Sequence, residues 1–236
     1  MIKNYVAFDL ETTGLNCERD EIIEIGALKV TGGKVSGRFS CLIRPENPIS
    51  PEITAITGIT NDMVADAPPV TKAIPEFLLF CRDDLLLGHN LMFDYKFTKV
   101  QARRLGLPFE KQGLDTLKIA RTVHKSLPSR SLGALCEHYH IVNAAAHRAY
   151  HDALATAKIY QMMAHYYEDR YPEVFEPVSL TYRPKKQQPA TAKQKAYLNE
   201  LVKYHKIDFN QDAEMMTKSE MSRVIDKIIL VHGRMI

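Results

Sequence analysis

Large apolar side chains and hydrophobic–polar alternation predict three β-strands near the start of the chain. The strands are expected over residues 5–10, 21–30 and 34–43. Gly32-Gly33 separates the second strand from the third, which favours a hairpin. Residues 45–69 then hold several prolines, so a long ordered loop or short helical turns are expected there. A loop of this length in a compact domain is usually functional.

Beyond residue 69 the apolar residues recur mainly at helical spacing. Helices are predicted over residues 70–81, 92–105, 131–139 and 150–167, with a short strand at 85–88 and a strand running into a helix at 114–121. The helix at 150–167 is rich in Ala, Met and Tyr, as expected of a helix packed on a core. We expect these strands and helices to form an α/β domain.

A run of prolines near residue 180 indicates where this domain ends. We expect the first domain to cover residues 1–177 and a polar, extended linker to cover residues 178–190. Residues 191–236 are then predicted to form a small helical module, with helices over 192–205 and 218–232. Residues 178–236 carry 11 Lys and Arg against 6 Asp and Glu, so the module is basic.

Length and composition place the chain among ordinary globular proteins. Its 236 residues suffice for one well-buried domain and a small second one, and the net charge is only +3. No apolar run approaches a membrane span and the N-terminus lacks a signal-peptide pattern, so we expect a cytoplasmic protein with no membrane partner. The four cysteines are widely separated, which argues against a zinc ribbon or redox motif.

Two acidic residues stand out on the first predicted strand. Asp9 and Glu11 are two positions apart, so they share one face of the strand. Like charges held together there need a cation between them or a proton on one of them. Oxygen ligands suit Mg²⁺ or Mn²⁺, which predicts a metal site. The alternative for the pair alone is an ordinary solvated face of a strand.

Two further segments carry acids of interest. Asn90 and Asp94 are four residues apart, which would place them on one face of a helix just after a short strand. His147 precedes Asp152 by five residues, and Asp152 falls in the first turns of the long Ala-rich helix. Taken singly, Asp94 could simply face water, Asp152 could be a helix-start residue and His147 a surface histidine.

The order of these motifs resembles a known enzyme family. The segments Phe-Asp-Leu-Glu-Thr-Thr-Gly-Leu, His-Asn-Leu-Met-Phe-Asp and His-x-x-x-x-Asp are similar to the three motifs of the DEDD (DnaQ-like) 3′-to-5′ exonucleases. Members include the proofreading epsilon subunit of DNA polymerase III. The resemblance covers roughly residues 4–168, and a histidine five positions before the last acid is typical of the histidine subgroup. It implies an RNase H-like fold with a mixed sheet flanked by helices.

The resemblance also implies roles for the motif residues. Asp9, Glu11 and Asp152 would ligate two Mg²⁺ or Mn²⁺ ions, with Asp94 as the fourth acid of the centre. Two such ions can hold a phosphodiester and activate the attacking water. His147 would be the general base, because a neutral imidazole can accept a proton from that water. The implied reaction releases nucleoside monophosphates from a free 3′ end of single-stranded nucleic acid, with DNA favoured over RNA.

Family members bind the terminal nucleotide beside the first motif, which implies substrate contacts as well. Thr12 and Leu15 are placed to contact the 3′ end, and Phe93 could stack on a base or ribose. Core packing is the alternative for Leu15 and Phe93. Thr57 stands where several members have His, which leaves the substrate contacts of that loop open. Asp115 resembles a recurrent family position that supports the fold rather than binding metal.

Alternative functions remain at this point. The chain could be a non-catalytic nucleic-acid-binding or polymerase-associated subunit, but loss of an acid would be expected and none is lost. An exoribonuclease that trims RNA is a second alternative, whereas an RNase H-type endonuclease is disfavoured by His147. The basic module could tether single-stranded nucleic acid. It could equally dock on a replication or repair protein, or merely aid solubility.

Overall fold

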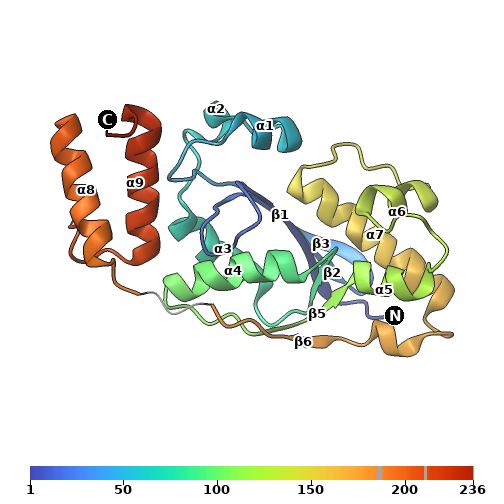
Figure 1. Ribbon diagram of the computed structural model, residues 1–236. Coiled ribbons are helices and arrows are strands. Elements are labelled where there is room, and N and C mark those ends of the chain that lie inside the picture. Colours follow the sequence, from blue (N-terminus) through green and yellow to red (C-terminus); the bar gives the residue numbers. More distant parts are fainter. Residues whose placement is uncertain (185–187, 210–211, 236) are drawn as a thin grey trace. The chain divides into compact units, whose positions relative to one another are not determined.

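The chain forms two compact units, residues 1–183 and 184–236. The structure is a computed structural model that describes residues 1–184, 188–209 and 212–235 (Figure 1). Each unit is described by itself. Part of the expected linker, residues 185–187, lies outside the described residues.

The first unit is built on a mixed sheet, as predicted, and this sheet has six strands. The strand order is β3-β2-β1-β4-β5-β6, formed by Lys34–Leu42, Ile22–Thr31, Tyr5–Thr12, Leu86–Gly88, Lys111–Asp115 and Val178–Leu180. β1, β2 and β3 are antiparallel neighbours, whereas β1, β4 and β5 run parallel. β1 therefore has an antiparallel neighbour on one side and a short parallel neighbour on the other.

Helices cover both faces of this sheet (Figure 1). Side chains of α5 (Thr116–Val123), α6 (Leu132–His138) and α7 (Ala149–Tyr167) form one core cluster, and α3 (Val70–Cys81) and α4 (Met92–Arg104) contribute to the other. Tyr5 and Ala7 of β1 join the α7 cluster, whereas Val6 and Phe8 join the α3–α4 cluster. Because strand residues alternate between faces, Asp9 and Glu11 continue the row that faces α7.

Small residues let α7 lie close to the sheet. Ala149, Ala153 and Ala157 are buried on this helix. Gly26 of β2 lies directly under its first turn, where an added Cβ would stand 1.9 Å from the backbone nitrogen of Tyr150. No larger residue fits there without moving the helix. This close approach fixes the start of α7 against the middle of β2.

The proline-rich stretch at 45–69 forms short helical turns, one of the two predicted outcomes. α1 (Pro51–Thr57) and α2 (Asn61–Val64) are capped by the hydroxyls of Ser50 and Thr60. Thr57 is buried, and its hydroxyl donates a hydrogen bond to the Ile53 carbonyl. The Thr57 hydroxyl therefore stabilises the loop itself.

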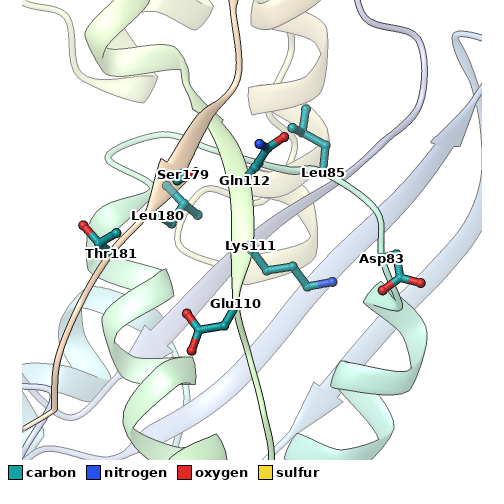
Figure 2. Close-up of a pocket in the computed structure, with 8 residues that line it drawn as sticks. All are labelled: Asp83, Leu85, Glu110, Lys111, Gln112, Ser179, Leu180 and Thr181. Carbon is teal, nitrogen blue, oxygen red and sulfur yellow. The ribbon is translucent and has the colours of Figure 1, made fainter.

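The segment after residue 177 differs from the linker expected there. After a short 3-10 helix (η1, Pro172–Phe175), Val178–Leu180 pairs with β5 as the edge strand β6. Figure 2 shows β5 and β6 side by side, where their residues line an open pocket with Asp83 and Leu85. Sequence pattern alone does not show a three-residue strand between prolines. The ordered first unit thus extends to Arg183.

The second unit contains the two predicted helices, α8 (Ala192–His205) and α9 (Lys218–His232). Each begins with a capping box, Thr191 with Gln194 and Thr217 with Glu220. Leu198, Leu201 and Met221 are buried in its small core. Among the described residues, no helix has the length and apolar character needed to cross a membrane.

The pairing of β6 predicts that Leu180 contributes to stability although it lies in the expected linker. Leu180 is 5% exposed and packs in the α3–α4 cluster, so Leu180→Ala should lower the free energy of unfolding by about 2–4 kcal/mol. Val178 is 50% exposed on the same strand, and Val178→Ala should change it by less than about 0.5 kcal/mol. Denaturant unfolding of both variants measures this, and equal, negligible effects would contradict it.

Candidate active site

The predicted acids gather where β1 runs past the end of its parallel neighbour. β4 stops at Gly88, so the β1 residues beyond this point have no strand on that side. Asp94, in the first turn of α4, fills the gap: the Leu10 backbone N–H donates to its Oδ1 at 3.1 Å. Leu10 lies between Asp9 and Glu11, so the Asp94 carboxylate reaches the same strand end. Crevices at the carboxyl ends of strands, where the strand order reverses, are common ligand sites in α/β sheets.

The start of α7 brings His147 and Asp152 to this strand end. The Asp152 carboxylate accepts hydrogen bonds from the backbone N–H of His147 at 2.9 Å and from the Asn143 amide at 2.6 Å. His147 adopts a left-handed backbone conformation with φ of 61°, which histidine adopts more readily than most residues. The turn before α7 is thus tied to the helix by Asp152 itself. Nothing in the sequence marked Asn143, because its role depends on the path of this turn.

Three of the predicted site residues lie close enough together to share one metal ion. One ligand atom from each of Glu11, His147 and Asp152 lies within 4.8 Å of the other two. The carboxylates of Glu11 and Asp152 are largely buried, whereas His147 is exposed. Within the part of the chain that the structure describes, Asp9 and Asp94 fall outside this group of three.

Electrostatic repulsion shows that all four acids nevertheless share one environment. Burial raises the pKa of Asp9 well above its usual value, and the charges of Asp94 and Asp152 raise it further. Burial, followed by repulsion from Asp152, raises the pKa of Glu11 to about 8. Burial also raises the pKa values of Asp94 and Asp152, against the opposing effect of their hydrogen bonds. Four carboxylates that repel each other fit a hard divalent cation, because such cations prefer oxygen ligands.

A fifth acid, Glu24, was not singled out from the sequence. It lies on β2 directly opposite Glu11 in the strand register and is 1% exposed. Its carboxylate pairs with Arg148, the residue after His147. Glu24 could have been recognised only from the register of β1 against β2, which places it on the face that carries Asp9 and Glu11.

The three residues predicted to bind substrate differ in their surroundings. Leu15 is 86% exposed in the loop after β1, so it is not a core residue. Phe93 is half-buried and packs on Phe97, with ring centroids 5.0 Å apart. Thr12 is buried, and its hydroxyl donates to the Gly14 carbonyl at 2.7 Å. Contact of these residues with substrate stays a prediction.

Two neighbouring polar residues have structural roles. Asp115 caps α5 by accepting the Leu117 N–H, and it also accepts the Asn90 N–H, in keeping with the fold-supporting role expected for it. The expectation that Asn90 shares a helical face with Asp94 is wrong. Asn90 precedes α4, which begins at Met92, and has a φ of 65° because the chain turns sharply there.

The raised pKa of Glu11 predicts that the metal-free protein loses stability as the pH rises. In the unfolded chain Glu11 loses its proton near its ordinary pKa of 4.5, whereas in the folded protein it keeps the proton until about pH 8. The folded state binds more protons in this window, so the free energy of unfolding falls as the pH rises through it. In EDTA, unfolding at about pH 5.5 and about pH 8 should show this fall, and Glu11→Gln should reduce it by at least about 1 kcal/mol. An unchanged pH dependence in this variant would contradict the prediction.

The chain matches the model of the RNase_T exonuclease family over residues 6–160. It is 43% identical over 159 residues to the PolC-type DNA polymerase III of Caldanaerobacter subterraneus, covering 67% of this chain and 11% of that protein. It is 38% identical over 157 residues to the DNA polymerase III subunit epsilon of Aquifex aeolicus, covering 66% of this chain and 78% of that protein. The chain thus spans about a tenth of the length of its PolC-type relatives.

Solved structures show the same fold. Exonuclease X in complex with 5′-overhanging duplex DNA is 28% identical, with a TM-score of 0.57 over 73% of this chain and 99% of that one. E. coli exonuclease I with a dT13 oligonucleotide is 20% identical, with a TM-score of 0.65 over 74% of this chain and 43% of that one, and shares the fold. With the family model matching two thirds of the chain, this protein belongs to the RNase_T exonucleases, the DnaQ-like family that its three motifs indicate.

Proposed function

We propose that this protein is a metal-dependent 3′-to-5′ exonuclease that releases nucleoside monophosphates from single-stranded nucleic acid, with DNA preferred over RNA. One observation carries the proposal: four acids from β1, α4 and α7, three of them buried and Asp9 partly exposed, lie close enough to repel one another beside an exposed histidine. Family membership gives the reaction class. The preference for DNA is supported by DNA-bound exonuclease X and by the polymerase III relatives.

Asp9, Glu11, Asp94 and Asp152 are the residues that would hold two Mg²⁺ or Mn²⁺ ions. The donor set fits, because buried and mutually repelling carboxylates gain most from a divalent cation. When bound, such ions neutralise the phosphate charge and make water a stronger nucleophile. A charged Lys or Arg in the same place would relieve the repulsion but supply no open coordination position.

His147 would take the proton from the attacking water. Its ring is exposed at the edge of the site, beside Glu11 and Asp152, where water and substrate can reach it. Asp152 holds the His147 backbone, so the ring extends from a fixed point. Arg148, the next residue, is held in an ion pair with Glu24, so the imidazole of His147 is the group that would act as the general base.

The 3′-terminal nucleotide would lie across the loop after β1. Leu15 projects into solvent from that loop and offers an apolar surface to a base. Phe93, next to Asp94, would contact the terminal base or ribose with the part of its ring that Phe97 leaves uncovered. The Thr12 backbone and hydroxyl would bound the site beside Glu11.

The other functions considered are less well supported. A non-catalytic subunit would not need four carboxylates held close together, since their repulsion costs stability. An exoribonuclease would use the same residues and differs only in substrate, so the assay below includes RNA. For the C-terminal module we propose a contact with single-stranded nucleic acid or with a replication or repair protein, supported by its basic charge and by its own small core.

Incubation of 5′-labelled single-stranded DNA and RNA with the protein and Mg²⁺ tests the proposed function. We expect a ladder that shortens from the 3′ end and is abolished by EDTA. Asp9→Asn should lower the rate by about a hundredfold or more, because it removes a carboxylate from the metal site. Asp66→Asn, at an exposed acid outside the cluster, should leave the rate unchanged. Only internal cuts, or products that form in EDTA, would overturn the proposal.

His147→Ala separates a general base from a metal ligand. As a base, His147 should be needed for turnover, so the variant should lose about 10²–10⁴-fold in rate. The rise in melting temperature caused by Mg²⁺ should persist, because the carboxylates remain. His151→Ala, at the neighbouring histidine of α7, is the matched control and should keep both properties. Loss of the Mg²⁺-induced shift in His147→Ala would show instead that the imidazole ligates the metal.

A further inference from the structure

We infer that Glu24 is a positioning residue for the active site. Glu24 belongs to β2, a strand that supplies none of the proposed metal ligands, and it fixes the point at which α7 begins. That point determines where His147 and Asp152 stand. The inference rests on the proposed function, because it assumes that these two residues act on the substrate.

Glu24 uses both carboxylate oxygens to hold the turn before α7. Its Oε1 accepts from the Arg148 Nη2 at 2.9 Å, and the Arg148 Nε lies 3.3 and 3.2 Å from the two oxygens. Its Oε2 also accepts the Ala149 backbone N–H at 3.1 Å. A guanidinium bound by two nitrogens gives a charged pair of defined geometry, which a single contact does not.

These contacts take the place of an ordinary helix cap. α7 begins at Ala149, and Arg148 at the cap position makes no side-chain capping bond. The first N–H groups of a helix have no partner inside the helix, and a carboxylate at this end is favoured by the helix dipole. Glu24 therefore caps α7 from another element, so the helix start is attached to the sheet as well as to its own preceding turn.

Gly26 provides independent support for the same attachment. It lies two residues after Glu24 and on the same face, and the first turn of α7 passes so close that no Cβ fits. Steric contact at Gly26 and the ion pair at Glu24 thus fix the same turn. Because the His147 backbone N–H donates a hydrogen bond to Asp152, fixing this turn also fixes the positions of His147 and Asp152.

The ion pair also suits its acidic surroundings. A lone carboxylate at Glu24 would add to the repulsion already present around Glu11 and Asp152, and the Arg148 charge opposes it. The pair can therefore hold α7 without adding net negative charge to the site. Misplacement of catalytic groups by about 1 Å can cost about a hundredfold in rate.

Glu24→Gln tests the inference in the 236-residue chain. Glutamine keeps the shape and an acceptor for the Ala149 N–H but loses the charged pair with Arg148. With Mg²⁺ and single-stranded DNA, we expect kcat to fall about tenfold or more while KM stays within about twofold. Hydrogen exchange at residues 147–150 should become faster. The double variant E24Q/R148Q should lose little more than the single variant, because both changes remove one interaction.

Asp84→Asn is the matched control. It removes the Lys29–Asp84 ion pair, which is also made by β2 but lies away from α7. This variant should keep the parental kcat and the parental exchange at residues 147–150. A lower melting temperature in both variants with unchanged kcat in Glu24→Gln would reduce Glu24 to a purely structural role and overturn the inference.

Different results would contradict the proposed function and the inference about Glu24. If the parent protein does not shorten DNA from the 3′ end, the proposed function is wrong, and the exchange measurement still decides whether Glu24 holds the turn. If the parent is active and Glu24→Gln matches it in both kcat and exchange, only the inference about Glu24 is wrong.

Discussion

Repulsion among buried carboxylates is the constraint on which the rest of the site depends. Burial, together with the charges of Asp94, Asp152 and Glu11, raises the pKa of Asp9, so Asp9 cannot readily ionise unless a positive charge compensates them. A fold without a ligand gains nothing from this arrangement, since each uncompensated buried charge lowers stability. The cost is understandable if the cluster exists to bind divalent cations. The electrostatics therefore support the proposed metal site independently of the resemblance of the motifs.

The sheet explains how residues far apart in the sequence reach one point. The early end of β4 exposes the edge of β1 to Asp94, and the absence of a side chain at Gly26 lets the start of α7 reach β2. Asp152 and Glu24 then fix the turn that carries His147 from two sides. The proposed metal ligands thus stand on regular elements, and only the exposed histidine stands on a turn.

Much of the fold and of the candidate site can be predicted from the sequence pattern. Alternation on β1 placed Asp9 and Glu11 on one face, and helical spacing predicted α3 and α8 with the observed bounds. Glu24 and Asn143 were missed because their roles depend on strand register and on the path of a turn, which local patterns do not determine. β6 was missed because three residues between prolines carry too little pattern, and pairing with β5 stabilises the strand.

Anomalous X-ray scattering from crystals soaked with Mn²⁺ tests the central claim most directly. The account predicts Mn²⁺ peaks within coordination distance of carboxylate oxygens of Asp9, Glu11 and Asp152. It also predicts that these peaks disappear in crystals of Asp9→Asn. Ordered carboxylates without a Mn²⁺ peak between them, or peaks only elsewhere on the molecule, would contradict it.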